Sequence, residues 1–182
     1  MGILDWLGLD KREAASGRTD GDTETVRKIV AELDAMEPAR ARHLAAFAYI
    51  LGRVAHADLD ISDDEVRAME EVVQRIGEVP EDQAILIVQM AKSQNQLFGG
   101  TENYLVTREF RDISSSDERQ HLLDCLFAVS ASDGSISSAE EAQIRLIADE
   151  LGFTHREYVD TRSRYSDQRE VLKPLHDDTS EE

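Results

Sequence analysis

The sequence contains few of the residues that define several common protein classes. It has a single cysteine, Cys125, in 182 residues, so it can form neither a disulfide framework nor a thiolate metal centre. Cys125 falls in an apolar helical run, which favours a small core residue. No apolar run approaches the length of a membrane span, and the N-terminus lacks the basic start of a secretory signal. We therefore expect a cytoplasmic protein.

Basic residues are also scarce. Lysine and arginine number 20 against 38 aspartates and glutamates, which gives a formal net charge of −18. This charge argues against nucleic acid or an anionic membrane as the main partner. The negative charge is compatible with cations or basic proteins as partners. The competing interpretation is that it only keeps the protein soluble. With 41% hydrophobic residues, the chain has enough apolar surface to build one folded domain.

The apolar residues recur at helical spacing, and no segment alternates as a strand does. Only three prolines and ten glycines interrupt the chain, which leaves room for long helices. The sequence therefore predicts an all-α fold of about seven to eight helices. The expected helix starts lie near Thr23, Pro38, Ser62, Pro80, Thr101, Ser115, Ser137 and Thr154. Four of these starts have a glutamate three residues later, as in a capping box: Ser62 with Glu65, Ser115 with Glu118, Ser137 with Glu140, and Thr154 with Glu157.

Composition divides the chain into three parts. Residues 1–22 combine a short apolar patch, which holds Trp6, with a polar linker that contains glycine. Residues 23–168 form the predicted helical domain, and residues 169–182 form an acidic tail. Two interpretations of residues 1–9 stay open. They either dock on a partner or a membrane surface, or they fold back on the domain or fray.

Two segments of the chain resemble each other at an offset of 75 positions. Residues 54–77 and 129–152 both show an apolar helix, an aspartate, a tight turn, and a serine that starts a second helix. The identical pairs include Asp58 with Asp133, Ser62 with Ser137, Glu65 with Glu140, and Gly77 with Gly152. This pattern predicts two pseudo-symmetric helical hairpins.

The repeat places acidic residues on the core-facing stripe of each hairpin. Glu140 precedes Ile144 by four positions and Asp133 follows Val129 by four, and the first copy has the same spacing. Packing of the hairpins about a pseudo-twofold axis would bring four carboxylates together: Asp58, Glu65, Asp133 and Glu140. Two carboxylates about 5 Å apart repel by about 3 kcal/mol at an effective dielectric constant near 20. Such a cluster needs protons, arginines or a divalent metal ion, and oxygen ligands suit Ca²⁺, Mg²⁺ or Mn²⁺.

A simpler interpretation of the same residues stays open. Glu65 and Glu140 can serve only as capping residues, and Asp58 and Asp133 can serve only to shape turns. The five histidines fall into no metal-binding spacing, and no nucleophile has a base placed beside it by sequence. We therefore expect no enzyme activity, with a metal-dependent hydrolase as the weakest alternative.

The second copy resembles the TerB-like family, which includes tellurite-resistance TerB and a domain of DjlA-type membrane co-chaperones. The family pattern is an apolar helix that runs into Asp-Gly-x-Ile-x-x-x-Glu, matched here from Asp133 to Glu140. The resemblance implies an all-helical bacterial domain in a stress response, with metal ligands at Asp133 and Glu140 and, by the repeat, at Asp58 and Glu65. The first copy differs by having Leu59 where the second has Gly134.

Together the residues and the resemblance predict a non-enzymatic helical module that binds a divalent cation and a protein partner in a tellurite or stress response. The alternative is an interaction scaffold without metal. We expect no nucleic-acid partner and leave open a weak or indirect association with a membrane.

Overall fold

The computed structural model describes residues 20–55, 63–93, 103–132 and 134–168. Within these residues the chain forms α-helices and a short 3-10 helix, and it forms no strand. The elements are α2 (Asp20–Ala35), α3 (Pro38–Ala55), α4 (Asp63–Ile76), α5 (Glu81–Lys92), α7 (Asn103–Ile113), α8 (Ser116–Ser130), α9 (Ser138–Leu151), α10 (His155–Ser163) and η2 (Ser166–Gln168). The predicted all-α class is confirmed.

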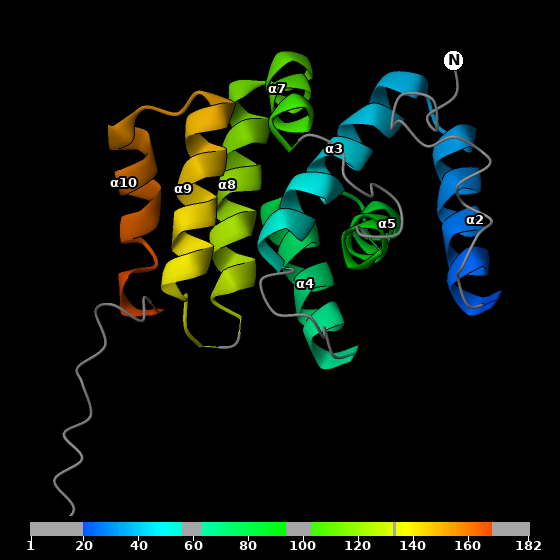
Figure 1. Ribbon diagram of the computed structural model, residues 1–182, viewed down its shortest axis with the longest axis horizontal. Coiled ribbons are helices and arrows are strands. Elements are labelled where there is room, and N and C mark those ends of the chain that lie inside the picture. The colour runs from blue at the N-terminus through cyan, green and yellow to red at the C-terminus, as the bar shows by residue number, and fades with distance from the viewer. Residues whose placement is uncertain (1–19, 56–62, 94–102, 133, 169–182) are drawn as a thin grey trace, which may run out of the picture.

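The helices form two groups that meet at α3 (Figure 1). Helices α8, α9 and α10 stand side by side, while α5 is seen end-on among α2, α3 and α4. Helix α3 packs against α5 on one side and against α8 and α9 on the other, and α4 packs against α5 and α8. The helices of the two predicted hairpins are therefore in contact. The predicted approach of their turns involves residues 58–62, which lie outside the described residues.

Local capping signals explain where three of the helices begin. Helices α8, α9 and α10 start directly after Ser115, Ser137 and Thr154, and each of these residues forms a complete capping box. In each box the N-cap hydroxyl accepts from a backbone N–H, and the glutamate accepts from the N-cap backbone. A cap of this kind stabilises a helix by about 1 kcal/mol. Three of the four predicted boxes are thus confirmed, and the fourth, Ser62 with Glu65, lies outside the described side chains.

The predicted start of the first helix differs from the structure. Helix α2 begins at Asp20, earlier than the expected start at Thr23 and inside the stretch assigned to the linker. The sequence predicts that Gly77 closes α4, and α4 does end at Ile76, directly before it. The positive φ of this turn, 52°, falls on Glu78.

The core runs through the whole helical array. Helix α3 is buried along most of its length, and α5 is buried on more than one side, as its nearly continuous apolar sequence predicts. Cys125 on α8 is fully buried and carries a free thiol. Burial raises the pKa of this thiol, so Cys125 behaves as a small apolar core residue. Among the described residues no helix combines the length and the apolar character that crossing a membrane would require.

The segment after α10 packs back on α8. The ring of Tyr165 stacks on Phe127 with a centroid distance of 5.3 Å, and its hydroxyl donates to the backbone oxygen of Asp124 at 3.2 Å. Arg164 forms an ion pair with the Asp124 carboxylate at 2.8 Å.

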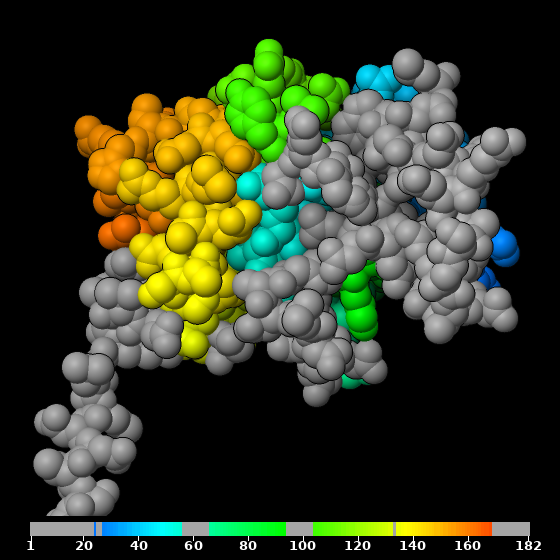
Figure 2. Space-filling model, viewed as in Figure 1, coloured from blue at the N-terminus to red at the C-terminus, as the bar shows by residue number. Residues whose placement is uncertain are grey.

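On the face shown in Figure 2, α10, α9 and α7 contribute neighbouring parts of the surface.

Candidate functional site

The turn between α8 and α9 carries the second copy of the acidic motif. At its start the hydroxyl of Ser132 donates to the backbone oxygen of Val129 at 2.7 Å. Gly134 adopts a φ of 92°, which an L-residue with a Cβ rarely takes. The N–H of Ile136 donates to the backbone oxygen of Gln168 at 2.7 Å, which ties the turn to η2. The turn is thus fixed by local bonds and by a contact distant in sequence.

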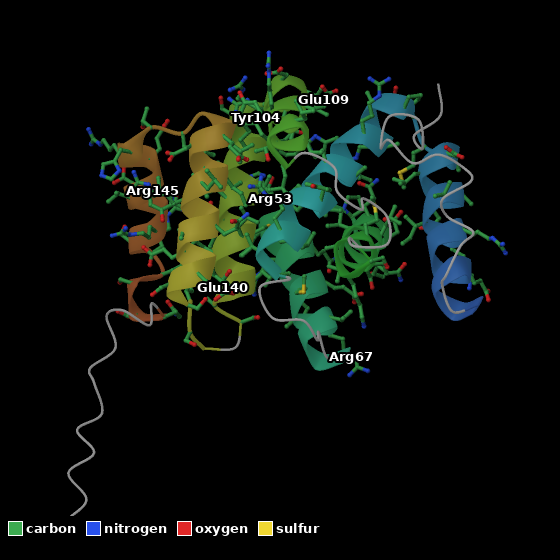
Figure 3. The ribbon with its side chains drawn as sticks, in the orientation of Figure 1. Arg53, Arg67, Tyr104, Glu109, Glu140 and Arg145 are labelled. Carbon is green, nitrogen blue, oxygen red and sulfur yellow. The ribbon has the colours of Figure 1, made fainter. Side chains whose placement is uncertain are left out.

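Glu140 lies at this end of α9, near the lower edge of the molecule in Figure 3. Its Oε2 accepts a hydrogen bond from the N–H of Ser137 at 2.8 Å, and its own N–H donates to the Ser137 hydroxyl at 3.2 Å. The residue is half-buried and continues the stripe of the fully buried Ile144, as predicted. The capping bond uses one acceptor site of a carboxylate that has about four. Capping and cation binding at Glu140 are therefore chemically compatible.

The structure places the other three predicted ligands only in part. Glu65 lies in the first turn of α4, but its side chain is outside the described residues, as are Asp58 and Asp133. Among the side chains that are described, no group of three or more histidines, cysteines and carboxylates is arranged to hold one metal ion. Of the predicted four, only Glu140 belongs to that set, so convergence of the four carboxylates stays a prediction.

A cavity of about 460 Å³ lies between α3, the connection from α4 to α5, and the first turns of α8. Its wall contains one arginine, two histidines and three carboxylates: Arg40, His43, His121, Glu78, Asp117 and Glu118. Phe47 and Val79 contribute apolar wall. The cavity therefore combines charged groups with an apolar surface, which is the usual chemistry of a binding pocket.

The charged groups of this cavity form two histidine–carboxylate pairs. Nε2 of His43 lies 3.8 Å from Oε1 of Glu118, and Nε2 of His121 lies 3.9 Å from Oε1 of Glu78. The Arg40 guanidinium donates from Nε to the side-chain oxygen of Gln83 on α5 at 3.1 Å. Arg40 is thus held by α5, while the histidines face carboxylates across the cavity.

The surroundings of His43 and Glu118 shift the pKa values of both groups. Burial lowers the pKa of His43 more than the nearby Glu118 raises it, and Arg40 lowers it further, so the neutral imidazole is favoured. The hydrogen bond from the Ser115 backbone is the main cause of a lowered pKa at Glu118, whose carboxylate is therefore ionised. An ionised Glu118 therefore faces a neutral His43 in this part of the cavity.

The sequence prediction missed this cavity. Its residues come from three segments, 40–47, 77–79 and 117–121, that share no periodic pattern. One local signal exists, because Glu118 and His121 are three positions apart and so share a helix face. The histidines were set aside because no two of them have a metal-binding spacing, a test that cannot detect a histidine paired with a carboxylate from another helix.

A buried ion pair joins three helices above the acidic turn (Figure 3). Nη1 of Arg53 on α3 donates to Glu150 on α9 and to the hydroxyl of Thr107 on α7, both at 2.7 Å. The side chains of Arg53 and Glu150 are only 3% and 12% exposed. With its amide oxygen turned inward, Gln143 accepts from the same guanidinium at 3.2 Å. Every part of this cluster has a partner, so it fixes α3, α7 and α9 relative to one another.

These observations define an all-helical domain in which a half-buried glutamate and an ordered turn end the α8–α9 hairpin. The family model described as tellurite resistance protein TerB matches residues 43–163, which is more than half of the chain. The chain therefore belongs to the TerB family, as the motif from Asp133 to Glu140 predicted. No curated protein and no solved structure matches the chain.

Proposed function

We propose that the chain is a non-enzymatic, cytoplasmic module of tellurite resistance that holds a divalent cation and contacts a protein partner. The proposed ligands are Asp58, Glu65, Asp133 and Glu140. The observation that carries the proposal is the position of Glu140, which is half-buried at an ordered turn and retains acceptor capacity beyond its capping bond. Membership of the TerB family supports the tellurite-resistance context.

Exposed apolar side chains support a protein partner. Tyr104 and Leu105 on α7 are each 52% exposed, and Leu146 on α9 is 48% exposed. Helices α7 and α9 are in contact and reach the surface next to each other (Figure 2). Apolar residues that are exposed on adjacent helices are typical of interaction surfaces when they form a patch.

A second candidate function is an interaction scaffold without metal. The capping boxes favour it, because Glu118 and Glu157 make the same bonds as Glu140 at helix starts outside the repeat. A glutamate at this position therefore has a complete explanation in helix capping. Under this alternative the carboxylates stabilise helices and bind no ion.

Thermal unfolding with added Ca²⁺, Mg²⁺, Mn²⁺ or Zn²⁺ separates the two functions. An ion that binds only the folded protein raises its melting temperature by mass action. At an ion concentration 100 times the dissociation constant, the folded state gains about 2.7 kcal/mol of stability. We expect this response in the parent and its loss in a variant with Asp58→Asn and Asp133→Asn. Glu140→Gln should also lose it, although glutamine can still form the capping bond.

Glu157→Gln is the matched control, because Glu157 caps α10 and is not a proposed ligand. It should keep the full ion response. If none of the four ions raises the melting temperature of the parent, the cation site is wrong and the scaffold function stands.

A further inference from the structure

The cavity beside α8 is separate from Glu140. Glu118 and Asp117 lie in the first turn of α8, whereas Glu140 follows the last turn of that helix. The 15 residues of α8 span about 22 Å at 1.5 Å per residue. A ligand in the cavity would therefore occupy the opposite end of the helix from the acidic turn.

The charges of the cavity fit a cationic ligand. Glu78, Asp117 and Glu118 supply three carboxylates, while the only arginine of the wall, Arg40, is bonded to Gln83 on α5. The side chain of Glu78 is 70% exposed, and that of Glu118 is 42% exposed, so both carboxylates are accessible to a ligand. Charge-assisted hydrogen bonds from an ammonium or guanidinium group to such carboxylates are among the stronger polar contacts in proteins.

The shape and the apolar wall fit a long side chain. A volume of about 460 Å³ lies within the range of ligand pockets and exceeds the need of a bare ion. Phe47 and Val79 provide apolar surface next to the carboxylates. Lysine and arginine place their methylene stems along apolar surface and their charged ends in polar surroundings, which matches this combination.

We propose that the cavity binds a lysine or arginine side chain of a partner protein, whose charged end pairs with Glu78, Asp117 and Glu118. The inference rests on the protein-contact part of the proposed function and is independent of the divalent cation. It adds the chemistry of the partner, which must present a basic residue on its contact surface.

His43 makes this binding depend on pH. His43 faces Glu118 from α8 and Arg40 from its own helix, and it packs against the Phe110 ring of α7 at 5.0 Å. His121 faces Glu78 from the α4–α5 connection. A protonated His43 would take Glu118 as its partner and would add positive charge to the cavity. A basic side chain should therefore bind less tightly as the pH falls.

The first test is an NMR titration of the whole protein without metal ions. The probes are Nα-acetylarginine amide and Nα-acetyllysine amide, with Nα-acetylcitrulline amide as the uncharged counterpart of the arginine probe. We expect the charged probes to shift the amide signals of Glu78, Glu118 and His121, and the citrulline probe to shift none of them. Affinity should fall as the pH drops below about 6.5, because burial lowers the pKa of His43 and this imidazole gains its proton only there.

Charge-neutral variants test which residues bind the probe. Glu78→Gln and Glu118→Gln should each weaken binding by about two- to fivefold, as expected for partly exposed ion pairs. Glutamine at position 118 can still cap α8, so the variant should remain folded. Glu157→Gln, which alters a capping glutamate that does not line the cavity, should bind the probes as the parent does.

Three results would overturn the inference. They are equal binding of the citrulline probe, unchanged affinity in both cavity variants, and binding of spermidine at much lower concentration than either amino-acid probe, which would assign the cavity to free polyamines. If the protein responds to divalent ions but does not bind the charged probes, the basic-side-chain inference is wrong and the cation site stands. If it binds the probes but shows no ion response, the cation site is wrong and the inference stands.

Discussion

The buried pair of Arg53 and Glu150 offers a direct test of what holds the helices together. Removal of one member of a buried ion pair leaves the other without compensation and costs about 3–5 kcal/mol. In Glu150→Leu the charge that remains is Arg53, whose side chain is 3% exposed; among the described residues its further acceptors are Thr107 and Gln143. We therefore expect Glu150→Leu to lower the free energy of unfolding by about 3–5 kcal/mol.

The reverse substitution should cost less. In Arg53→Met the remaining charge is Glu150, whose side chain is 12% exposed and lies nearer to solvent. Water can reach that carboxylate after a small movement, so we expect a loss of about 1–3 kcal/mol. The double variant leaves no unpaired charge and should be more stable than Glu150→Leu, because apolar replacement of a whole buried pair is often close to neutral.

Equilibrium unfolding in urea measures these free energies, provided that the slope of the unfolding free energy against urea concentration is the same in all variants. Arg156→Met is the matched control, because Arg156 pairs with Asp160 at 3.9 Å on the surface, where the side chains are 92% and 67% exposed. Its effect should be within about 0.5 kcal/mol. A loss below about 1 kcal/mol in Glu150→Leu, or no recovery in the double variant, would refute the buried-pair argument.

Further predictions concern the caps and the pH dependence of stability. Gly152→Ala should lower the free energy of unfolding by about 1–2 kcal/mol in urea, because an L-residue is strained at its φ of 87°; an unchanged value would contradict the left-handed cap. Because burial lowers the pKa of His43 in the folded state, the unfolded chain binds more protons, so stability should fall as the pH drops below about 6.5. His43→Gln should flatten that slope in melting curves across pH. Because the pKa of Glu118 is lowered in the folded state, stability should fall further as the pH drops below about 4.3. This further fall should be absent in Glu118→Gln.

The sequence predicts the fold well where the signal is local. Helices α8, α9 and α10 begin directly after Ser115, Ser137 and Thr154, because a capping box needs only residues three positions apart. Gly77 and Gly152 occupy matching positions of the repeat, and each directly follows a helix, α4 and α9. The positive φ falls on Gly152 itself after α9, but on Glu78 after α4.

Contacts between distant segments could not be predicted in this way. Arg53 stands in an apolar helical run, and its partners Thr107 and Glu150 follow 54 and 97 positions later. No spacing rule links such positions, so the ion pair becomes visible only when α3, α7 and α9 are packed. The cavity has the same origin, because His43 and Glu118 come from different helices and carry no shared motif.

The capping geometry changes which residues test the cation site best. The bonds of Glu140 are repeated at Glu118 and Glu157, so a glutamate in this position needs no metal to explain it. A cap does not require an aspartate, so substitution of the repeated Asp58 and Asp133 tests ligation more directly than substitution of Glu140.

Ser137→Ala separates the two roles, because it removes the capping hydroxyl of α9 and leaves all four carboxylates in place. It should lower stability by about 1 kcal/mol and still show the rise in melting temperature with a divalent ion. The variant with Asp58→Asn and Asp133→Asn should show the opposite result, with α9 still capped and the ion response lost. If Ser137→Ala alone abolished the ion response, ligation would depend on the cap, and the aspartates would not be sufficient to define the site.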